Sequence, residues 1–142
     1  MRQAAIVVSL AAGLGLCTLA RADTVWNSQD GKCQVAAPAD WKQGPAGKGS
    51  LVSPDGKSDA WVDGSELPFA MFQQAIMPSL QATKVIKNTD SYYAAELKAG
   101  GQKHTLYIIM ARGKNATCRV ELHYAAKDAA AAQKIGASLK LK

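Results

Sequence analysis

The chain has 142 residues, of which 48% are hydrophobic and 20% charged, and its formal net charge is +6. This length supports one domain with a sizeable core. The basic residues are scattered with no run or stripe, which excludes the basic face typical of nucleic-acid-binding proteins. The excess positive charge could favour contact with an anionic surface, but ordinary solubility is the better account of it.

The N-terminus has the pattern of a bacterial secretory signal peptide. A short positive leader with Arg2 precedes an apolar run over residues 4–20, and Ala20-Arg21-Ala22 is an A-x-A cleavage pattern. An uncleaved membrane anchor is the alternative, but the run is short and broken by glycine for a spanning helix. A lipoprotein is disfavoured because Leu16, rather than a small residue, precedes Cys17.

We therefore expect a signal peptide over residues 1–22 and a single domain over residues 23–142. Cleavage removes Arg2 and Arg21 and leaves a net charge of +4. The expected location is periplasmic or secreted, without stable membrane insertion after cleavage.

Two cysteines, Cys33 and Cys118, remain after cleavage. In an oxidising compartment, two cysteines favour one intramolecular disulfide. A metal or thiol site is the alternative, but neither cysteine belongs to a C-x-x-C motif or has a histidine nearby. A disulfide closing so long a loop would add about 4 to 5 kcal/mol of stability at most.

The first part of the mature chain alternates extended segments with turn signals. Turns are indicated by Asp30-Gly31, Pro38-Ala39-Asp40-Trp41, the glycine-rich residues 44–49 and Pro54-Asp55-Gly56-Lys57. Between them, we expect strands at residues 24–28, 33–37, 50–53 and 58–62.

A helix is expected next, with Ser65 as its N-cap and Pro68 in its first turn. Its apolar stripe consists of Phe69, Phe72, Ile76 and Leu80. Because Pro78 lacks an N–H, the helix should end or bend near Met77.

Further strands are expected at residues 82–87 and 92–98, followed by a central hairpin. Residues 106–110 are apolar on both faces, so this strand should be covered on both sides. Its partner alternates, with Cys118, Val120, Leu122 and Tyr124 on one face and Arg119, Glu121 and His123 on the other. A turn at residues 113–116 would place Arg112 opposite Thr117. A terminal helix is expected over residues 128–141.

Consecutive strands joined by short turns imply a mainly antiparallel sheet. Two helices, one on each face, would cover the central strand. The sequence therefore predicts a single α+β domain, an α/β/α sandwich.

The pattern resembles the PsbP-like superfamily. The resemblance is carried by the strand that leads into Pro38-Ala39-Asp40-Trp41, the glycine-rich loop, the hairpin, the helix near Pro68-Phe69 and the closing helix. The superfamily includes photosystem accessory proteins, Ran-binding factors and small exported bacterial proteins. Its members share no catalytic site, so the resemblance implies an accessory or binding role, although fold alone does not fix function.

The two histidines, His104 and His123, are weak metal candidates. In the expected register Leu106 faces His123, so His104 lies diagonally from His123 on one face. Without a third ligand they make a poor zinc site, and no metal is predicted. Copper handling is rejected because Met71, Met77 and Met110 form no M-x-x-M or H-x-x-M cluster.

Trp26, Trp41 and Trp61 all precede the first helix. Grouped aromatic residues can line a ligand groove, whereas core packing is their usual role. Trp41 and Trp61 are therefore kept as candidate groove residues.

No catalytic residues are predicted, because the chain contains no G-x-S-x-G elbow and no paired acid constellation. Asp55, Asp59 and Asp63 lack the spacing of a calcium loop. We expect a non-enzymatic exported envelope protein without a cofactor, which binds another envelope component. The alternative is a periplasmic carrier of a small molecule or metal, and a hydrolase is disfavoured.

The cleavage pattern yields the first testable prediction. Intact-mass measurement of the exported protein should give Asp23 as its N-terminal residue, because A-x-A motifs direct cleavage after their last residue. A chain that keeps Met1 in the membrane fraction would indicate an anchor instead.

Overall fold

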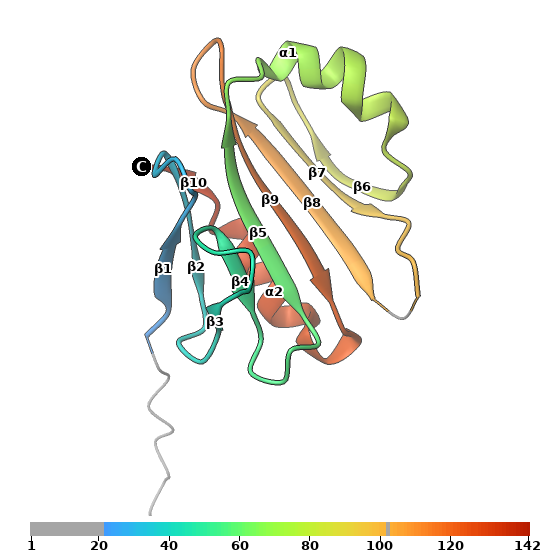
Figure 1. The fold of residues 1–142 in the computed structure, drawn as a ribbon. Coiled ribbons are helices and arrows are strands. Elements are labelled where there is room, and N and C mark those ends of the chain that lie inside the picture. The colour runs from blue at the N-terminus through green and yellow to red at the C-terminus, as the bar shows by residue number, and fades with distance from the viewer. Residues whose placement is uncertain (1–21, 102) are drawn as a thin grey trace, which may run out of the picture.

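Seven antiparallel strands form the main sheet, in the order β3-β4-β5-β9-β8-β7-β6 (Figure 1). The computed structural model describes residues 22–101 and 103–142, so residues 1–21 of the expected signal peptide lie outside the described residues. The strands are β3 Lys42–Gln43, β4 Ser50–Val52, β5 Asp59–Ser65, β6 Ala82–Asn88, β7 Tyr92–Leu97, β8 His104–Ala111 and β9 Thr117–Tyr124. In the described part of the chain, no helix is long and apolar enough to cross a membrane.

A second, small sheet and the terminal helix cover one face of the main sheet (Figure 1). The small sheet has the order β1-β2-β10, with β1 Thr24–Asn27, β2 Cys33–Ala37 and β10 Lys140–Leu141. The helix is α2, Ala129–Ala137. Ala132 and Ile135 of α2 are fully buried in the core on this side.

Gly136 lets α2 approach the sheet closely. A Cβ at this position would lie 2.7 Å from Ile108 Cδ1 and 3.1 Å from Leu106 Cδ2. Both distances are shorter than ordinary van der Waals contact, so any side chain here would push α2 away from β8.

A helical segment, residues 69–79, lies on the opposite face. It begins as α1 at Phe69–Met71, continues as a π-helical turn at Phe72–Ile76 and ends as a 3-10 turn at Met77–Ser79. Phe72 is fully buried, with its ring centroid 5.6 Å from that of Tyr93 and 6.0 Å from that of Tyr107. The predicted apolar stripe is confirmed, because Phe69, Phe72, Ile76 and Leu80 all belong to or pack against the core on this side. The regular α-helix ends earlier than the predicted position near Met77, because the π-helical turn begins at Phe72.

The predicted N-cap at Ser65 is wrong. The helix is preceded directly by Pro68, and the Ser65 hydroxyl instead accepts a hydrogen bond from the Leu67 N–H at 3.1 Å. A residue before proline is driven out of the helical region, so Leu67 cannot belong to the helix.

The expectation that the central strand is covered on both sides is confirmed. Leu106 and Ile108 are buried on the α2 side, whereas Tyr107 and Ile109 are buried against residues 69–79. The strand β9 alternates as predicted, with its even-numbered residues at most 4% exposed and its charged side chains half-buried.

The register of the central hairpin differs by one residue from the prediction. Ala111, rather than Arg112, pairs with Thr117, and His123 therefore faces Thr105 instead of Leu106. The Arg112 N–H donates to the Ala116 carbonyl at 2.7 Å, so Arg112 belongs to the turn. The turn is thus longer than the four residues expected, which moves every pair by one position.

The terminal helix is shorter than predicted, because it ends at Ala137. The Ser138 hydroxyl donates to the Ile135 carbonyl at 2.6 Å and accepts from the Ala36 N–H at 2.8 Å. After this turn, Lys140 and Leu141 pair with Gln34 and Cys33 as β10. Tertiary pairing with β2 therefore replaces the last helical turn.

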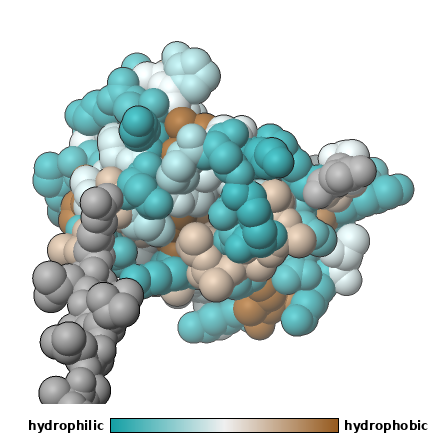
Figure 2. Space-filling view, turned by 90° about the horizontal axis from the view of Figure 1, so that it is seen from below, coloured by the Kyte–Doolittle hydropathy of each residue, from teal (hydrophilic) through white to brown (hydrophobic). Residues whose placement is uncertain are grey.

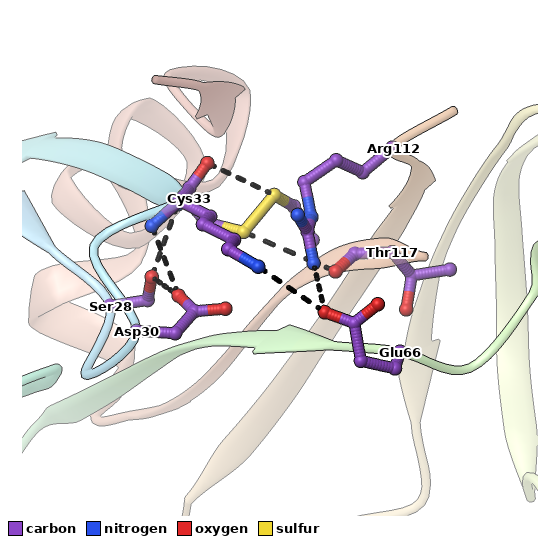
Figure 3. Close-up of a disulfide and its surroundings, with 8 residues drawn as sticks. Ser28, Asp30, Cys33, Glu66, Arg112 and Thr117 are labelled. Atoms are coloured by element: carbon purple, nitrogen blue, oxygen red, sulfur yellow. Dashed lines mark hydrogen bonds and ion pairs between the residues drawn. A yellow bond between two sulfur atoms is a disulfide. The ribbon is translucent and has the colours of Figure 1, made fainter. Parts of the chain in front are cut away.

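The predicted disulfide is present and joins the two sheets. Cys33 of β2 and Cys118 of β9 are fully buried, with their Cα atoms 5.7 Å apart. Figure 3 shows the disulfide beside Arg112 and Glu66, whose Nη2 and Oε1 atoms are 3.1 Å apart. The bond therefore ties the start of the domain to a central strand of the main sheet.

Leu122→Ala tests the assignment of the sheet faces. Leu122 is fully buried, so the substitution should lower the free energy of unfolding by about 2 to 5 kcal/mol through lost burial and a cavity. Urea unfolding measures the change, with Glu121→Ala as the matched control on the opposite face. A larger loss for the control would contradict the assignment.

Reduction of the disulfide should lower the thermal midpoint. The bond spans a sequence separation of 85 residues. Breaking it gives the unfolded chain more conformational entropy, which should lower the free energy of unfolding by about 4 to 5 kcal/mol. Circular dichroism at room temperature should still show native secondary structure, because both cores remain. Two free thiols in the non-reduced exported protein, or an unchanged midpoint after reduction, would contradict this account.

Candidate functional site

The face of the main sheet opposite α2 is covered over only part of its width. The segment of residues 69–79 packs on side chains of β7 and β8, and Figure 1 shows it over that part of the sheet, away from β5. On the same face, β5 and β9 present six half-buried residues, which we call the polar ladder: Asp59, Trp61, Asp63, Arg119, Glu121 and His123.

Strand alternation and the β5–β9 register place these six side chains together. Ala60 and Val62 point into the core on the α2 side, so their neighbours on β5 point to the uncovered face. Cross-strand pairing then sets Asp59 opposite His123, Trp61 opposite Glu121, and Asp63 opposite Arg119. The ladder is therefore a direct result of the pairing of two strands distant in sequence.

The charged groups of the ladder are paired with one another. Arg119 Nη2 lies 3.1 Å from Asp63 Oδ2, and the His123 ring nitrogens lie 3.1 Å from Asp59 Oδ1 and from Glu121 Oε1. Both histidine contacts are hydrogen bonds only when the ring carries two protons. Such half-exposed pairs contribute little stability, so their main effect is to hold the side chains in a fixed arrangement.

Tyr107 links the ladder to the core under residues 69–79. Burial raises the pKa of the Tyr107 hydroxyl, and the charge and hydrogen bond of Arg119 oppose this rise. Tyr107 also pairs with Glu121 across β8 and β9. The middle of the ladder therefore rests against a buried, neutral aromatic side chain.

Trp61 is the aromatic residue of the ladder and lines a shallow hollow of about 360 Å³ together with Val52 and Asp59. The glycine-rich loop lies against its strand, because the Val62 N–H donates to the Gly49 carbonyl at 2.8 Å. Gly49 has a φ of +93°, and a Cβ there would lie 2.8 Å from the Val62 oxygen. Glycine is therefore required for this close approach.

A second hollow, of about 300 Å³, lies on the β9 side of the same end of the ladder and is lined by His123, Glu121 and Lys103 among others. Lys103 Nζ lies 3.4 Å from Asp59 Oδ2.

Seen from below, the surface is mainly hydrophilic and its hydrophobic areas are small (Figure 2). The ladder therefore presents paired charges and one aromatic side chain on a partly exposed face.

The two histidines lie on opposite faces of the sheet. His104 pairs with Tyr124 on the α2 side, with the ring centroids 5.4 Å apart, whereas His123 belongs to the ladder. The expected diagonal placement on one face is wrong, because it followed from the one-residue error in register. Within residues 22–101 and 103–142, no group of three or more His, Cys, Asp or Glu residues could hold a metal ion.

The structure does not bring Trp41 and Trp61 together. Trp41 is 4% exposed in the core on the α2 side, where Ala60 and Val62 also lie. Trp61 points the other way from the same strand and is half-buried. Of the two candidate groove residues, Trp61 alone reaches the uncovered face.

Four residues of the ladder were not predicted as site residues: Asp59, Asp63, Arg119 and Glu121. The sequence suggested only a calcium loop for the two aspartates, together with Asp55, and their spacing ruled it out. Asp55 lies outside the ladder, and its hydrogen bond with Lys127 holds the pKa of its carboxyl well below the usual range. The turn signal at residues 54–57 separates Asp55 from the other two, but no local pattern predicts the pairing of β5 with β9.

Comparison with known proteins supports the fold. No protein-family model matches the sequence, and no curated protein matches it. Among solved structures, one from Bacteroides thetaiotaomicron has a TM-score of 0.57 and 14% identity, and the match covers 85% of this chain and 48% of that one. The chain thus spans about half the length of that protein.

The solution structure of PsbP (CyanoP) from the cyanobacterium Synechocystis also matches, with a TM-score of 0.51 and 12% identity. The match covers 93% of this chain and 99% of the cyanobacterial one. At this identity the similarity concerns the fold alone. Together with the two sheets and two helices described above, it shows that the chain is a single α+β domain with the PsbP-like fold.

Proposed function

We propose that this chain is an exported bacterial envelope protein of non-enzymatic, accessory type, which binds another envelope protein through the polar ladder. The observation that carries the proposal is the uncovered half of the sheet face, where Trp61 lies between paired charges. A helix covers the other half of the same face, so the exposure of the ladder is local.

The composition of the ladder supports protein recognition. Tryptophan and arginine are enriched among the residues that dominate binding energy at protein interfaces. Trp61 lies between Asp59 and Asp63, which are held by His123 and Arg119. Because these side chains are already ordered, a partner would pay little conformational entropy to bind them.

The disulfide supports export. Buried disulfides form and persist in oxidising compartments, and Cys33–Cys118 joins the two sheets. The leader pattern of residues 1–22 points the same way.

The alternative, a periplasmic carrier of a small molecule or metal, has less support. His104 and His123 lie on opposite faces, and Trp41 belongs to the core rather than to the hollow beside Trp61.

Trp61→Ala tests the proposed function. The amount of partner protein that the variant captures from the envelope of the native host should fall by about 30-fold, which is the effect expected of an interface hot spot. Met71→Ala is the control, because Met71 is an exposed apolar residue (52%) of the segment of residues 69–79, outside the ladder. Thermal unfolding of both variants checks that the fold is retained. Equal capture by the wild type and the Trp61 variant would contradict the proposal.

A further inference from the structure

The strand β6 is exposed along its whole length, although it contains two large apolar residues. All seven of its residues are exposed, including Val85 at 54% and Ile86 at 47%. It forms the edge of the main sheet farthest from β3 (Figure 1). This edge is separate from the polar ladder, so it has no role in the function proposed above.

The two apolar side chains lie on opposite sides of the edge. Val85 pairs with Ala95, which belongs to the core under residues 69–79. Ile86 lies on the α2 side, where it lines a small hollow with Tyr92 and Ala94. The outermost rim of the sheet is therefore apolar on both sides at this point.

Lysines flank the apolar pair directly, at Lys84 and Lys87. The Lys87 Nζ atom lies 5.0 Å from the centroid of the Tyr92 ring. In the described part of the chain, neither lysine belongs to an ion pair. Glu96 lies opposite Lys84 in the β6–β7 register, on the neighbouring strand, and is half-buried.

We propose that the β6 edge docks on a lipid bilayer surface that carries anionic headgroups. Lys84 and Lys87 would meet the headgroup phosphates, while Val85 and Ile86 enter the interfacial region. Basic residues beside exposed apolar side chains are the usual means by which peripheral proteins bind anionic membranes. The excess positive charge of the whole chain adds long-range attraction to such a surface.

Pairing of β6 with the same strand of a second copy is less well supported. Two register shifts interrupt β6, between Ala82 and Lys84 and between Val85 and Lys87. Bulges and lysines on an edge strand are features that prevent strand addition. Two copies would also bring their lysines face to face.

The test uses a chain that begins at Asp23. All residues of the two cores lie between Trp26 and Leu139, so this chain retains the fold, which circular dichroism confirms. It should co-sediment at low salt with phosphatidylcholine vesicles that contain phosphatidylglycerol, and not with phosphatidylcholine alone. Raising the salt concentration should weaken the binding, because it screens the lysines.

Two pairs of variants locate the surface. Lys84→Glu combined with Lys87→Glu should weaken vesicle binding by about tenfold or more, whereas Lys42→Glu combined with Lys48→Glu at the opposite edge should change it by less than about twofold. Val85→Ser should weaken binding by about fivefold, and Val25→Ser is its matched control, since both valines are 54% exposed.

Equal losses in the β6 and control variants would overturn the proposal, because binding would then depend on total charge. Absence of binding to the anionic vesicles would also overturn it. So would a concentration-dependent dimer in sedimentation analysis that the β6 variants abolish, since β6 would then be an interface between copies.

Discussion

The antiparallel pairing of β5 with β9 is the interaction on which the rest of the structure depends. Seven residue pairs, from Asp59↔His123 to Ser65↔Thr117, join the first half of the domain to the last hairpin. Without this pairing the sheet would separate into β3-β4-β5 and β6-β7-β8-β9. Cys118 lies on β9 within the paired region, so the disulfide to Cys33 fastens the small sheet to the same place. One non-local pairing thus fixes both sheets and aligns the ladder residues.

The two faces of the main sheet are covered unequally, and this inequality decides which surface is free. On one side, α2 and the small sheet cover β5, β8 and β9 together. On the other side, residues 69–79 cover β7 and β8 only. The side chains of β5 and β9 that point to this second side are correspondingly polar, apart from Trp61. The buried residues behind this half-open face fix the position of its strands, which suits the recognition role proposed for the ladder.

The ladder and the β6 edge divide the proposed contacts between two parts of one sheet. The ladder lies on β5 and β9, whereas β6 is separated from β9 by β7 and β8. A protein on the ladder and a lipid surface at the β6 edge would therefore meet different strands. The core under residues 69–79 lies between these two surfaces and would keep their relative position constant.

The sequence by itself determined the α+β class, the burial of β8 on both faces, the alternation of β9 and the cysteine pair. Each of these depends on local periodicity or on cysteine count, which the order of residues contains directly. The tertiary structure alone decided the register of the central hairpin, the replacement of the last helical turn by β10 and the composition of the polar ladder. In each case the deciding contact joins residues that no local pattern relates: β10 with β2, and β5 with β9. Even the register of the hairpin depended on whether Arg112 extended the strand β8 or belonged to the turn. Strand propensity does not distinguish the two.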